Sequence, residues 1–384
     1  MQKTLSILGS TGSIGVQALE VAKQHGFKVA ALAAGRSGYE LESQIRAFKP
    51  AIAALEDEQA ARLLRIAVGD TFTKVLSGPQ GVCEIAQAPT DILLNAIVGI
   101  AGLRPTLTAL TSGKKRIALA NKETLVTGGE LVMRTAKDSG ASVIPVDSEH
   151  SAVFQCLLAA PPDQKIKKII LTASGGPFFR KGRQELETVT LAQTLKHPNW
   201  NMGAKITVDS ATMMNKGLEI IEAVRLFDLP QEQIDVVIHR ESIIHSMVEF
   251  CDHSVLAQMG TPDMRVPIQF ALTFPDRAPS LSPSLDLTKI GNLSFYPPDD
   301  QTFPAMNLCR ESLKAGGLKP TALNAANEEA VRLFLEEKIR FTDIFTLLEE
   351  ALDDQPVLPA ESIEAIFEAD AVARRKVNEK TNTP

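Results

Sequence analysis

The chain has 384 residues, of which 44% are hydrophobic and 22% are charged, and its net charge is −6. This composition is typical of a globular protein of two or three domains, and the acidic balance argues against general nucleic-acid binding. The four cysteines are far apart and form no Cys-x-x-Cys pair, which favours free thiols in a reducing compartment. Because no apolar run resembles a signal or a membrane span, we expect a cytoplasmic protein.

The first 150 residues alternate short apolar strands with helical segments. We expect strands at 5–8, 28–33, 51–55, 91–96, 116–120 and 142–146. Short apolar strands separated by helices predict a parallel sheet that is covered on both faces. The fold class is therefore α/β, and residues 1–146 are predicted to form a Rossmann-like nucleotide-binding domain.

A glycine-rich turn follows the first strand, with the spacing GxxGxxG from Gly9 to Gly15. Glycines let the backbone approach a pyrophosphate, and the N-terminus of the next helix attracts it. The second strand ends at Gly35-Arg36-Ser37, where an NAD site would carry an acidic residue. Arg36 can pair with a 2′-phosphate, so we favour NADP over NAD. The alternative for Arg36 is a solvated surface position.

Asn121, Lys122 and Glu123 stand where a strand gives way to a helix, at the edge of the sheet that faces ligands. Lys122 could hold an anionic or ketone oxygen, and Asn121 or Glu123 could contact a cofactor. The alternative is a simple helix start, with Asn121 as the N-cap and an exposed lysine.

The acidic triplet Asp147-Ser148-Glu149 ends the apolar run 142–146. If the strand continues through it, residues i and i+2 lie on one side, and their carboxylates repel unless a proton or a cation relieves them. Hard divalent cations take oxygen ligands of this kind. The triplet therefore predicts a cation site.

The middle of the chain carries a predicted anion turn and a predicted lid. A strand at 166–172 opens into Ser174-Gly175-Gly176, which can present a hydroxyl and N–H groups to an anion or be only a tight turn. The loop 196–203 holds His197 and Trp200, and it could close over a ligand. The alternatives are a structural histidine and a loop anchored by a buried tryptophan.

We expect a strand at 205–209, then Ser210 and a helix near 214–227. The helical period puts a core stripe on one face: Gly217, Ile220, Ile221, Val224 and Phe227. Asn215, Glu219 and Glu222 point the other way, with Lys216 on the flank.

Ser210, Asn215 and Lys216 make a candidate phosphate nest. Glu219 could add a third carboxylate to the cation site, but periodicity does not choose between Glu219 and Glu222. The alternative for both glutamates is a solvated helix face.

The remaining chain is predicted to hold a second sheet and a helical bundle. Strands at 234–238, 242–250 and 254–258 complete a mixed or antiparallel sheet that can serve as a dimer surface. His239 and His245 are expected to be structural. Four amphipathic helices are expected at 305–314, 321–336, 342–352 and 362–375. The predicted domains are 1–146, a catalytic domain at 147–274, a linker at 275–303 and a helical domain at 304–384.

Together, six ordered motifs resemble the 1-deoxy-D-xylulose 5-phosphate reductoisomerase family. They occupy residues 9–15, 118–123, 145–151, 174–178, 197–203 and 209–219. The resemblance implies that NADPH and Mg²⁺ or Mn²⁺ support rearrangement and reduction of 1-deoxy-D-xylulose 5-phosphate to 2-C-methyl-D-erythritol 4-phosphate. This is the committed step of the non-mevalonate route to isoprenoids. It also implies a homodimer.

The resemblance also implies roles for single residues. The metal ligands would be Asp147, Glu149 and Glu219. Lys122 and His197 would join them as catalytic residues. The substrate would contact Ser148, Ser174, His197, Trp200, Ser210, Asn215, Lys216 and Glu219, with Met202 beside Trp200 in the flap. The cofactor would contact Thr11, Gly12, Ser13, Ile14, Gly35, Arg36, Ser37, Asn121, Glu123 and Gly203.

Two positions depart from the family pattern. Ser37 stands where many relatives carry Asn, and His239-Arg240-Glu241-Ser242 stands where they often read His-Pro-Gln-Ser. The serine at position 37 puts one 2′-phosphate contact in doubt. The departure at residues 239–242 puts the local strand geometry and the dimer contact in doubt. Two rival functions are an NADP-dependent dehydrogenase without a catalytic metal and a nucleotide-sensing module without catalysis.

Overall fold

The structure is a computed structural model that describes residues 2–161, 165–200 and 202–381. The chain divides into two compact units. Unit 1 comprises Met1–Thr124, Val132–Ser151 and Asp263–Pro283, and unit 2 comprises Leu125–Leu131, Ala152–Pro262 and Ser284–Pro384. None of the helices in the described ranges combines the length and the apolar character that a membrane crossing requires.

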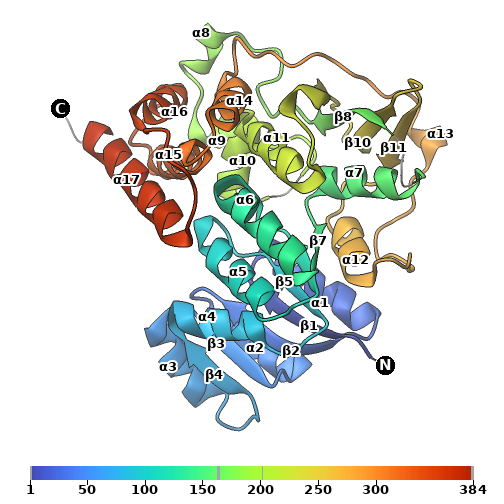
Figure 1. Ribbon diagram of the computed structural model, residues 1–384, viewed down its shortest axis with the longest axis vertical. Helices are drawn as coiled ribbons and strands as arrows, with labels where there is room; N and C mark the ends of the chain where they lie inside the picture. The colour runs from blue at the N-terminus through green and yellow to red at the C-terminus, as the bar shows by residue number, and fades with distance from the viewer. Residues whose placement is uncertain (1, 162–164, 201, 382–384) are drawn as a thin grey trace. The chain divides into compact units, whose positions relative to one another are not determined.

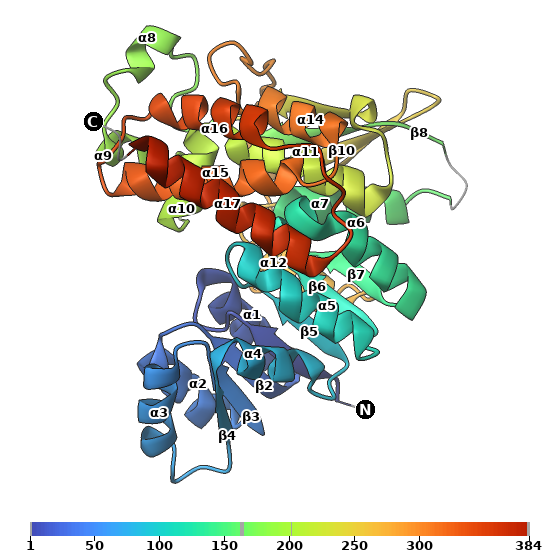
Figure 2. The same cartoon turned by 60° about the vertical axis from the view of Figure 1, so that its left-hand side comes forward.

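Unit 1 is built on a seven-stranded parallel sheet (Figures 1 and 2). Its strands are β1 Thr4–Leu8, β2 Lys28–Ala34, β3 Ile52–Leu55, β4 Lys74–Ser77, β5 Ile92–Asn95, β6 Arg116–Leu119 and β7 Ser142–Pro145. The order β4-β3-β2-β1-β5-β6-β7 confirms the α/β prediction, and it adds β4, which the sequence analysis missed. Because the strands are parallel, the turns after β1 and β2, and those after β6 and β7, lie at the same sheet edge.

Helices follow these strands. They are α1 Ser13–Gln24, α2 Gly38–Phe48, α3 Glu58–Ala67, α4 Gly78–Gln87, α5 Leu103–Thr111, α6 Lys122–Ser139 and α7 Ser148–Leu158. Candidate ligand segments lie at the starts of α1, α2, α6 and α7. A later helix, α12 Arg265–Thr273, returns to pack on α1, β6 and β7. The sequence analysis did not predict α12, whose apolar residues Ile268, Phe270 and Leu272 are buried in unit 1.

Unit 2 contains the mixed sheet that the sequence predicts. Its strands are β8 Ile166–Ala173, β9 Ile234–Ile238, β10 Ile244–Phe250 and β11 Val255–Met259. The order is β11-β10-β8-β9, with β8 and β9 parallel and the other pairs antiparallel. The helix α11 Met214–Phe227 packs on β8 and β9.

The C-terminal helices of unit 2 confirm the predicted bundle (Figure 1, orange to red). They are α14 Ala305–Ala315, α15 Lys319–Leu335, α16 Asp343–Asp354 and α17 Ile363–Thr381. Short helices precede them: α8 Arg183–Leu186, α9 Leu191–Thr194 and α13 Leu287–Ile290. Phe341 is 1% exposed and packs edge-on against Phe178, Phe334 and Phe345, which ties the bundle to the loop after β8.

The predicted strand at 205–209 is wrong, because these residues belong to helix α10, Ala204–Ala211. The β-branched run Ile206-Thr207-Val208 favours a strand, but tertiary contacts override that propensity. Lys205 and Asp209 form an ion pair of 2.8 Å at the i,i+4 spacing of a helix. Asn327 of α15 donates to the buried Asp209 at 2.8 Å, which holds the helical segment against the bundle.

Candidate functional site

The acidic triplet was expected to continue the strand before it. The structure shows that it does not. Strand β7 ends at Pro145, and Ser148 begins α7. Asp147 precedes this helix, and its Oδ1 accepts the N–H groups of Glu149 at 3.1 Å and His150 at 3.3 Å. The helix start still brings the two acidic side chains together, because carboxylate oxygens of Asp147 and Glu149 lie within 4.8 Å of each other.

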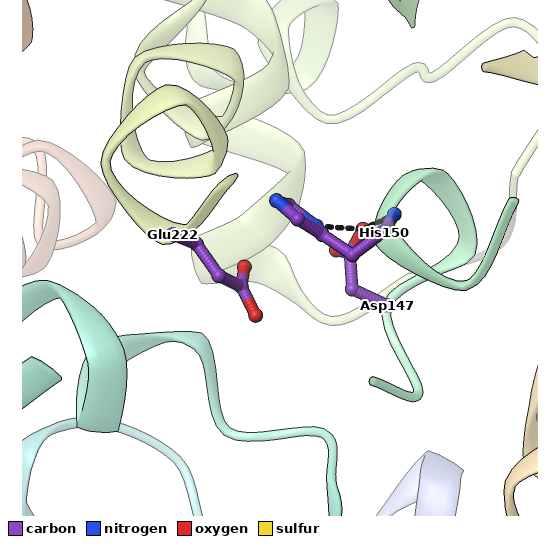
Figure 3. A group of neighbouring side chains, drawn as sticks. All are labelled: Asp147, His150 and Glu222. Atoms are coloured by element: carbon purple, nitrogen blue, oxygen red, sulfur yellow. Dashed lines mark hydrogen bonds and ion pairs between the residues drawn. The ribbon is translucent and has the colours of Figure 1, made fainter. Parts of the chain in front are cut away.

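Two basic side chains contact Asp147 in unit 1. Lys122 Nζ lies 2.6 Å from Asp147 Oδ2. His150 Nδ1 lies 2.8 Å from Asp147 Oδ1, and this contact is drawn in Figure 3. Glu222, which is also drawn in Figure 3, belongs to α11 of unit 2. Burial alone would raise the pKa of Asp147, but the charge of Lys122 and the contacts of His150 outweigh it and hold this pKa well below its ordinary value. Asp147 is therefore an ionised carboxylate.

The Asn121–Glu123 segment combines a helix cap with a buried lysine. Asn121 is the N-cap of α6, as the simpler alternative predicted, and accepts from Thr124 N–H at 3.0 Å. Its amide also donates to Glu123 Oε2 at 2.9 Å. Lys122 is only 8% exposed, so the alternative of an exposed lysine is wrong. The strand order explains this, because β6 and β7 are neighbours and deliver Lys122 and Asp147 to one edge.

The glycine turn has the geometry of a backbone approach site. Gly9 has a φ of +79°, and a Cβ there would lie 2.5 Å from Ala96 O. A Cβ on Gly15 would lie 2.3 Å from Gly9 O, so helix α1 requires glycine where it crosses the turn. Gly12 is the exposed N-cap of α1 and carries no side chain that could cap the helix N–H groups. Uncapped N–H groups at a helix start attract anions.

The two predicted cofactor segments are neighbours. The N–H groups of Gly9 and Ser10 donate to Ala33 O at 2.8 and 2.9 Å, so the β1 turn lies beside the end of β2. Gly35, Arg36 and Ser37 follow β2 and are exposed. The Arg36 side chain is 90% exposed, and its Nε lies 3.9 Å from Asp57 Oδ2.

Unit 2 brings two side chains of the predicted phosphate nest, Asn215 and Lys216, to the carboxylate of Glu219. Asn215 Nδ2 donates to Glu219 Oε1 at 2.6 Å, and Lys216 Nζ pairs with Glu219 Oε2. Glu219 and Glu222 are 0% and 1% exposed, so the alternative of a solvated glutamate face is wrong. Ser210 lies in the last turn of α10 rather than at a helix start, and α11 begins four residues later.

The turn at Ser174 lies against the end of helix α10. Gly175 and Gly176 have φ values of +75° and +64°, and a Cβ on Gly176 would lie 2.6 Å from Ser210 O. This close contact holds the turn against the junction between α10 and α11. Ser174 Oγ also lies 2.9 Å from His197 Nε2, so the predicted lid contacts the predicted anion turn.

The rest of the lid is described except for Asn201, which lies outside the described residues. The Trp200 ring lies 6.2 Å from the His245 ring, and Gly203 is the N-cap of α10. Burial is the main cause that lowers the pKa of His245 to about 4. The expected structural role of His239 is confirmed, because its Nε2 accepts the N–H groups of Ile243 and Ile244.

Sequence reasoning assigned no role to two residues that the structure places in these clusters. His150 follows Asp147 by three residues, the spacing at which a helix start returns a side chain to its cap. Arg240 donates to the carbonyls of Ser174 and Gly176, and only its departure from the family pattern had marked it. The strand before it is regular, because β9 pairs with β8 without a register shift.

Comparisons with known proteins agree over the whole chain. A family model described as 1-deoxy-D-xylulose 5-phosphate reductoisomerase matches residues 5–129, and models of the C-terminal domains of these enzymes match 143–227 and 259–376. The chain is 53% identical over 380 residues to the 1-deoxy-D-xylulose 5-phosphate reductoisomerase of Acetivibrio thermocellus, with 99% of each chain covered.

Solved structures give the same result. The Zymomonas mobilis enzyme in complex with NADPH is 40% identical, with a TM-score of 0.93 and 100% of both chains covered. A DOX-P reductoisomerase in complex with NADPH, fosmidomycin and magnesium is 42% identical, with a TM-score of 0.94, and the match covers 99% of this chain and 98% of that one. The chain belongs to the 1-deoxy-D-xylulose 5-phosphate reductoisomerase family.

Proposed function

We propose that this protein converts 1-deoxy-D-xylulose 5-phosphate to 2-C-methyl-D-erythritol 4-phosphate with NADPH and a divalent metal, in non-mevalonate isoprenoid synthesis. The full-length family match and the NADPH and magnesium complexes of its structural neighbours support this reaction. The structural observation that carries the proposal is the pair of carboxylates on Asp147 and Glu149, beside the buried Lys122.

The residues of this pair suit Mg²⁺ or Mn²⁺. Both offer hard oxygen donors within 4.8 Å of each other, and Asp147 is held ionised. We propose that Glu219 of unit 2 supplies the third carboxylate, because it is buried and already bound by Asn215 and Lys216. When bound, the ion would act as a Lewis acid on the ketone and hydroxyl oxygens of the substrate.

The chain's own side chains then orient the substrate. Lys122 and Ser148 lie beside the carboxylate pair, and their N–H and O–H groups can donate to substrate oxygens. Ser174, Ser210, Asn215 and Lys216 provide hydroxyl, amide and ammonium donors for the phosphate. A phosphate held far from the reacting carbons contributes binding energy that can drive closure.

The lid is proposed to exclude water from the reacting carbons. The contact between His197 and Ser174 supports this role, because it couples the lid to the phosphate donors. Trp200 and Met202 would cover the substrate and the nicotinamide. His197 would contact the substrate as a neutral imidazole, since burial and then the charge of Arg240 lower its pKa to about 4.

NADPH is proposed to bind along the sheet edge of unit 1. Its pyrophosphate would lie on residues 11–14, where Gly12 leaves the start of α1 open. Its 2′-phosphate would lie on residues 35–37, with Arg36 as the charged partner. Asn121, Glu123 and Gly203 would contribute further contacts. The division into domains at 1–146, 147–274, 275–303 and 304–384 remains a prediction.

A homodimer is proposed on the edge of the mixed sheet. Strand β11 is the first strand in the order, and it exposes Val255, Leu256 and Met259 by 47%, 37% and 37%. An exposed apolar edge strand is a surface for pairing with a second copy. We also propose a cytoplasmic location, which the free thiols of all four cysteines support. Light scattering of the purified protein tests the dimer.

The experiment that tests the reaction identifies the carbon skeleton of the product. The protein is incubated with ¹³C-labelled 1-deoxy-D-xylulose 5-phosphate and NADPH, and the product is analysed by NMR. A branched methylerythritol phosphate supports the proposal. An unbranched sugar alcohol phosphate would mean that the protein is a simple dehydrogenase, and NADPH binding without any turnover would favour a nucleotide sensor.

A further inference from the structure

Arg240 stands directly behind the Ser174 turn in unit 2. It follows β9, and its Nη1 donates to Ser174 O at 2.5 Å and to Gly176 O at 2.7 Å. Its guanidinium also lies 5.1 Å from the centre of the Phe179 ring. Hydrogen bonds from a charged donor are stronger than neutral ones, so Arg240 fixes two carbonyls of the same turn.

The same segment anchors the lid. Asn199 Nδ2 donates to the backbone oxygen of Arg240 at 2.5 Å and to Ser242 Oγ at 2.8 Å. The residues after β9 therefore contact the anion turn through the Arg240 side chain and the lid through the Arg240 backbone. A substitution of Arg240 removes the contacts to the anion turn and keeps the backbone oxygen that the lid binds.

The contacts of His197 determine how the Ser174 hydroxyl is oriented. His197 Nδ1 accepts the N–H groups of Asn199 at 3.2 Å and Trp200 at 3.0 Å, so Nε2 carries the proton of the neutral ring. Nε2 then donates to Ser174 Oγ at 2.9 Å, and Gly176 N–H donates to the same oxygen at 3.2 Å. Both contacts use lone pairs of Ser174 Oγ, and its hydrogen is directed to another acceptor.

Charge keeps this arrangement in place. Burial is the main cause of the low pKa of His197, and the positive charge of Arg240 lowers it further, to about 4. Among the described residues, the ring contacts Ser174 and two backbone N–H groups of the lid, and the charge that acts on it is that of Arg240. Glu241, the residue after Arg240, accepts from Ser294 Oγ at 2.6 Å. The imidazole is therefore a neutral donor to Ser174 at the pH of a cell.

We infer that Arg240 is a positioning residue for the phosphate group of the substrate: it holds the Ser174–Gly176 turn so that the Ser174 hydroxyl donates to a phosphate oxygen. This inference rests on the proposed function for the identity of the substrate. The recognised chemistry is a phosphate monoester, whose oxygens accept hydrogen bonds from the hydroxyl and from N–H groups of the turn.

The test compares three variants of the full-length protein. R240M keeps much of the side chain's length and removes its charge and its donors. R240K keeps a positive charge that can donate to the turn carbonyls. R180M is the matched control, because Arg180 is exposed and stacks on the same Phe179 ring at 5.1 Å. Circular dichroism first establishes that each variant is folded, and R240Q replaces R240M if the latter is not.

Steady-state kinetics provide the first readout. We expect R240M to raise the KM for the sugar phosphate about tenfold or more, which is the loss expected for charged hydrogen bonds, with kcat changed less than about twofold. R240K should recover most of this loss, and R180M should resemble the unsubstituted protein. An unchanged KM in R240M, or an equal rise in R180M, would overturn the inference.

The second readout does not depend on activity. NMR titrations follow two quantities. The first is the pKa of His197, whose ring signal is assigned with an H197Q variant, and the second is the binding of inorganic phosphate. R240M should raise the pKa of His197 above about 4 and weaken phosphate binding, and R180M should change neither. If the unsubstituted protein shows no turnover, the proposed function is wrong. These titrations still test the positioning role of Arg240 in that case. Identical titrations for R240M and the unsubstituted protein would refute it.

Discussion

Lys122 Nζ lies 2.6 Å from Asp147 Oδ2, and both side chains are nearly buried at the ends of neighbouring parallel strands. The ammonium group offsets the cost of burying the carboxylate and keeps it ionised without a metal. The proposed divalent ion would therefore bind an oxygen ligand that is already charged and fixed in place. The proposed metal site at the end of β7 is distinct from the proposed cofactor turn at the end of β1.

The first prediction concerns Asp147→Asn. The amide removes a charge that is proposed to hold the metal, so turnover should fall by about 100-fold to 1,000-fold, the range expected when a group that stabilises the transition state is lost. NADPH affinity should change less than about twofold, because the glycine turn lies elsewhere on the sheet. Fluorescence titration with NADPH and initial rates measure the two effects. Asp138→Asn, an exposed carboxylate on α6, is the control, and equal loss of rate and affinity would contradict the account.

The glycine turn offers a paired test of fold against function. Gly15→Ala should destabilise the protein by about 1–3 kcal/mol or more, because its Cβ would lie 2.3 Å from Gly9 O. A Cβ on Gly12 has its nearest neighbour at 3.4 Å, so Gly12→Ala should fold normally and lose NADPH affinity. Thermal melting and NADPH titration separate the two variants. Normal NADPH binding by folded Gly12→Ala would show that the pyrophosphate lies elsewhere.

Arg36→Ala tests the cofactor preference. Loss of charged hydrogen bonds to a 2′-phosphate should weaken NADPH binding about tenfold to 100-fold and leave NADH binding unchanged. The ratio of kcat/KM for the two cofactors measures this preference. Arg62→Ala, an exposed arginine on α3, is the control. An unchanged ratio in Arg36→Ala would refute the assignment of the 2′-phosphate site.

The pKa of His197 predicts how its substitution changes acid stability. Its pKa is lowered from 6.5 to about 4, so between these values the unfolded chain binds a proton that the folded protein does not. Stability therefore falls as the pH is lowered through this window, by at most about 1.4 kcal/mol per pH unit from this residue. His197→Gln should flatten the dependence, as measured by urea unfolding at several pH values. The same slope in both proteins would mean that His197 is protonated in the fold.

Lys216→Ala should affect both binding and stability. Lys216 and Glu219 form a buried ion pair in α11, so removal of the lysine should destabilise the metal-free protein by about 3 kcal/mol and raise the KM for the substrate. The double variant Lys216→Ala/Glu219→Gln should recover much of the stability but not the KM. Additive losses of stability in the double variant would show that the pair is not coupled.

The sequence predicted the elements whose pattern is local. Short runs such as Ile92–Asn95, which are mostly apolar, are buried along their whole length. Runs of this kind are typical of parallel strands. Strand β4 was missed because Lys74–Ser77 is short and its only fully buried residue is Val75. The 205–209 segment was misread because its helix depends on Asn327, more than 100 residues away. Contacts of this range leave no local pattern.

The candidate site could be predicted only in part, because some of its contacts also join residues that are far apart in the sequence. Motif order indicated Asp147, Glu149 and Lys122, although the carboxylates are brought together by a helix start rather than a strand. The periodicity of α11 placed Glu219 and Glu222 opposite its core stripe but did not reveal that both are buried. Arg240 donates to the carbonyls of Ser174 and Gly176, which lie 66 and 64 residues away in the sequence. No spacing in the sequence predicts such a contact.

A divalent ion on Asp147 and Glu149 is proposed to activate the sugar phosphate. The most direct test of this proposal is NADPH oxidation with 1-deoxy-D-xylulose 5-phosphate after EDTA treatment, followed by stepwise addition of Mg²⁺ or Mn²⁺. The account predicts that EDTA abolishes turnover, that either ion restores it in the unsubstituted protein and in Asp138→Asn, and that neither restores it in Asp147→Asn. Full turnover in the presence of excess EDTA would contradict it.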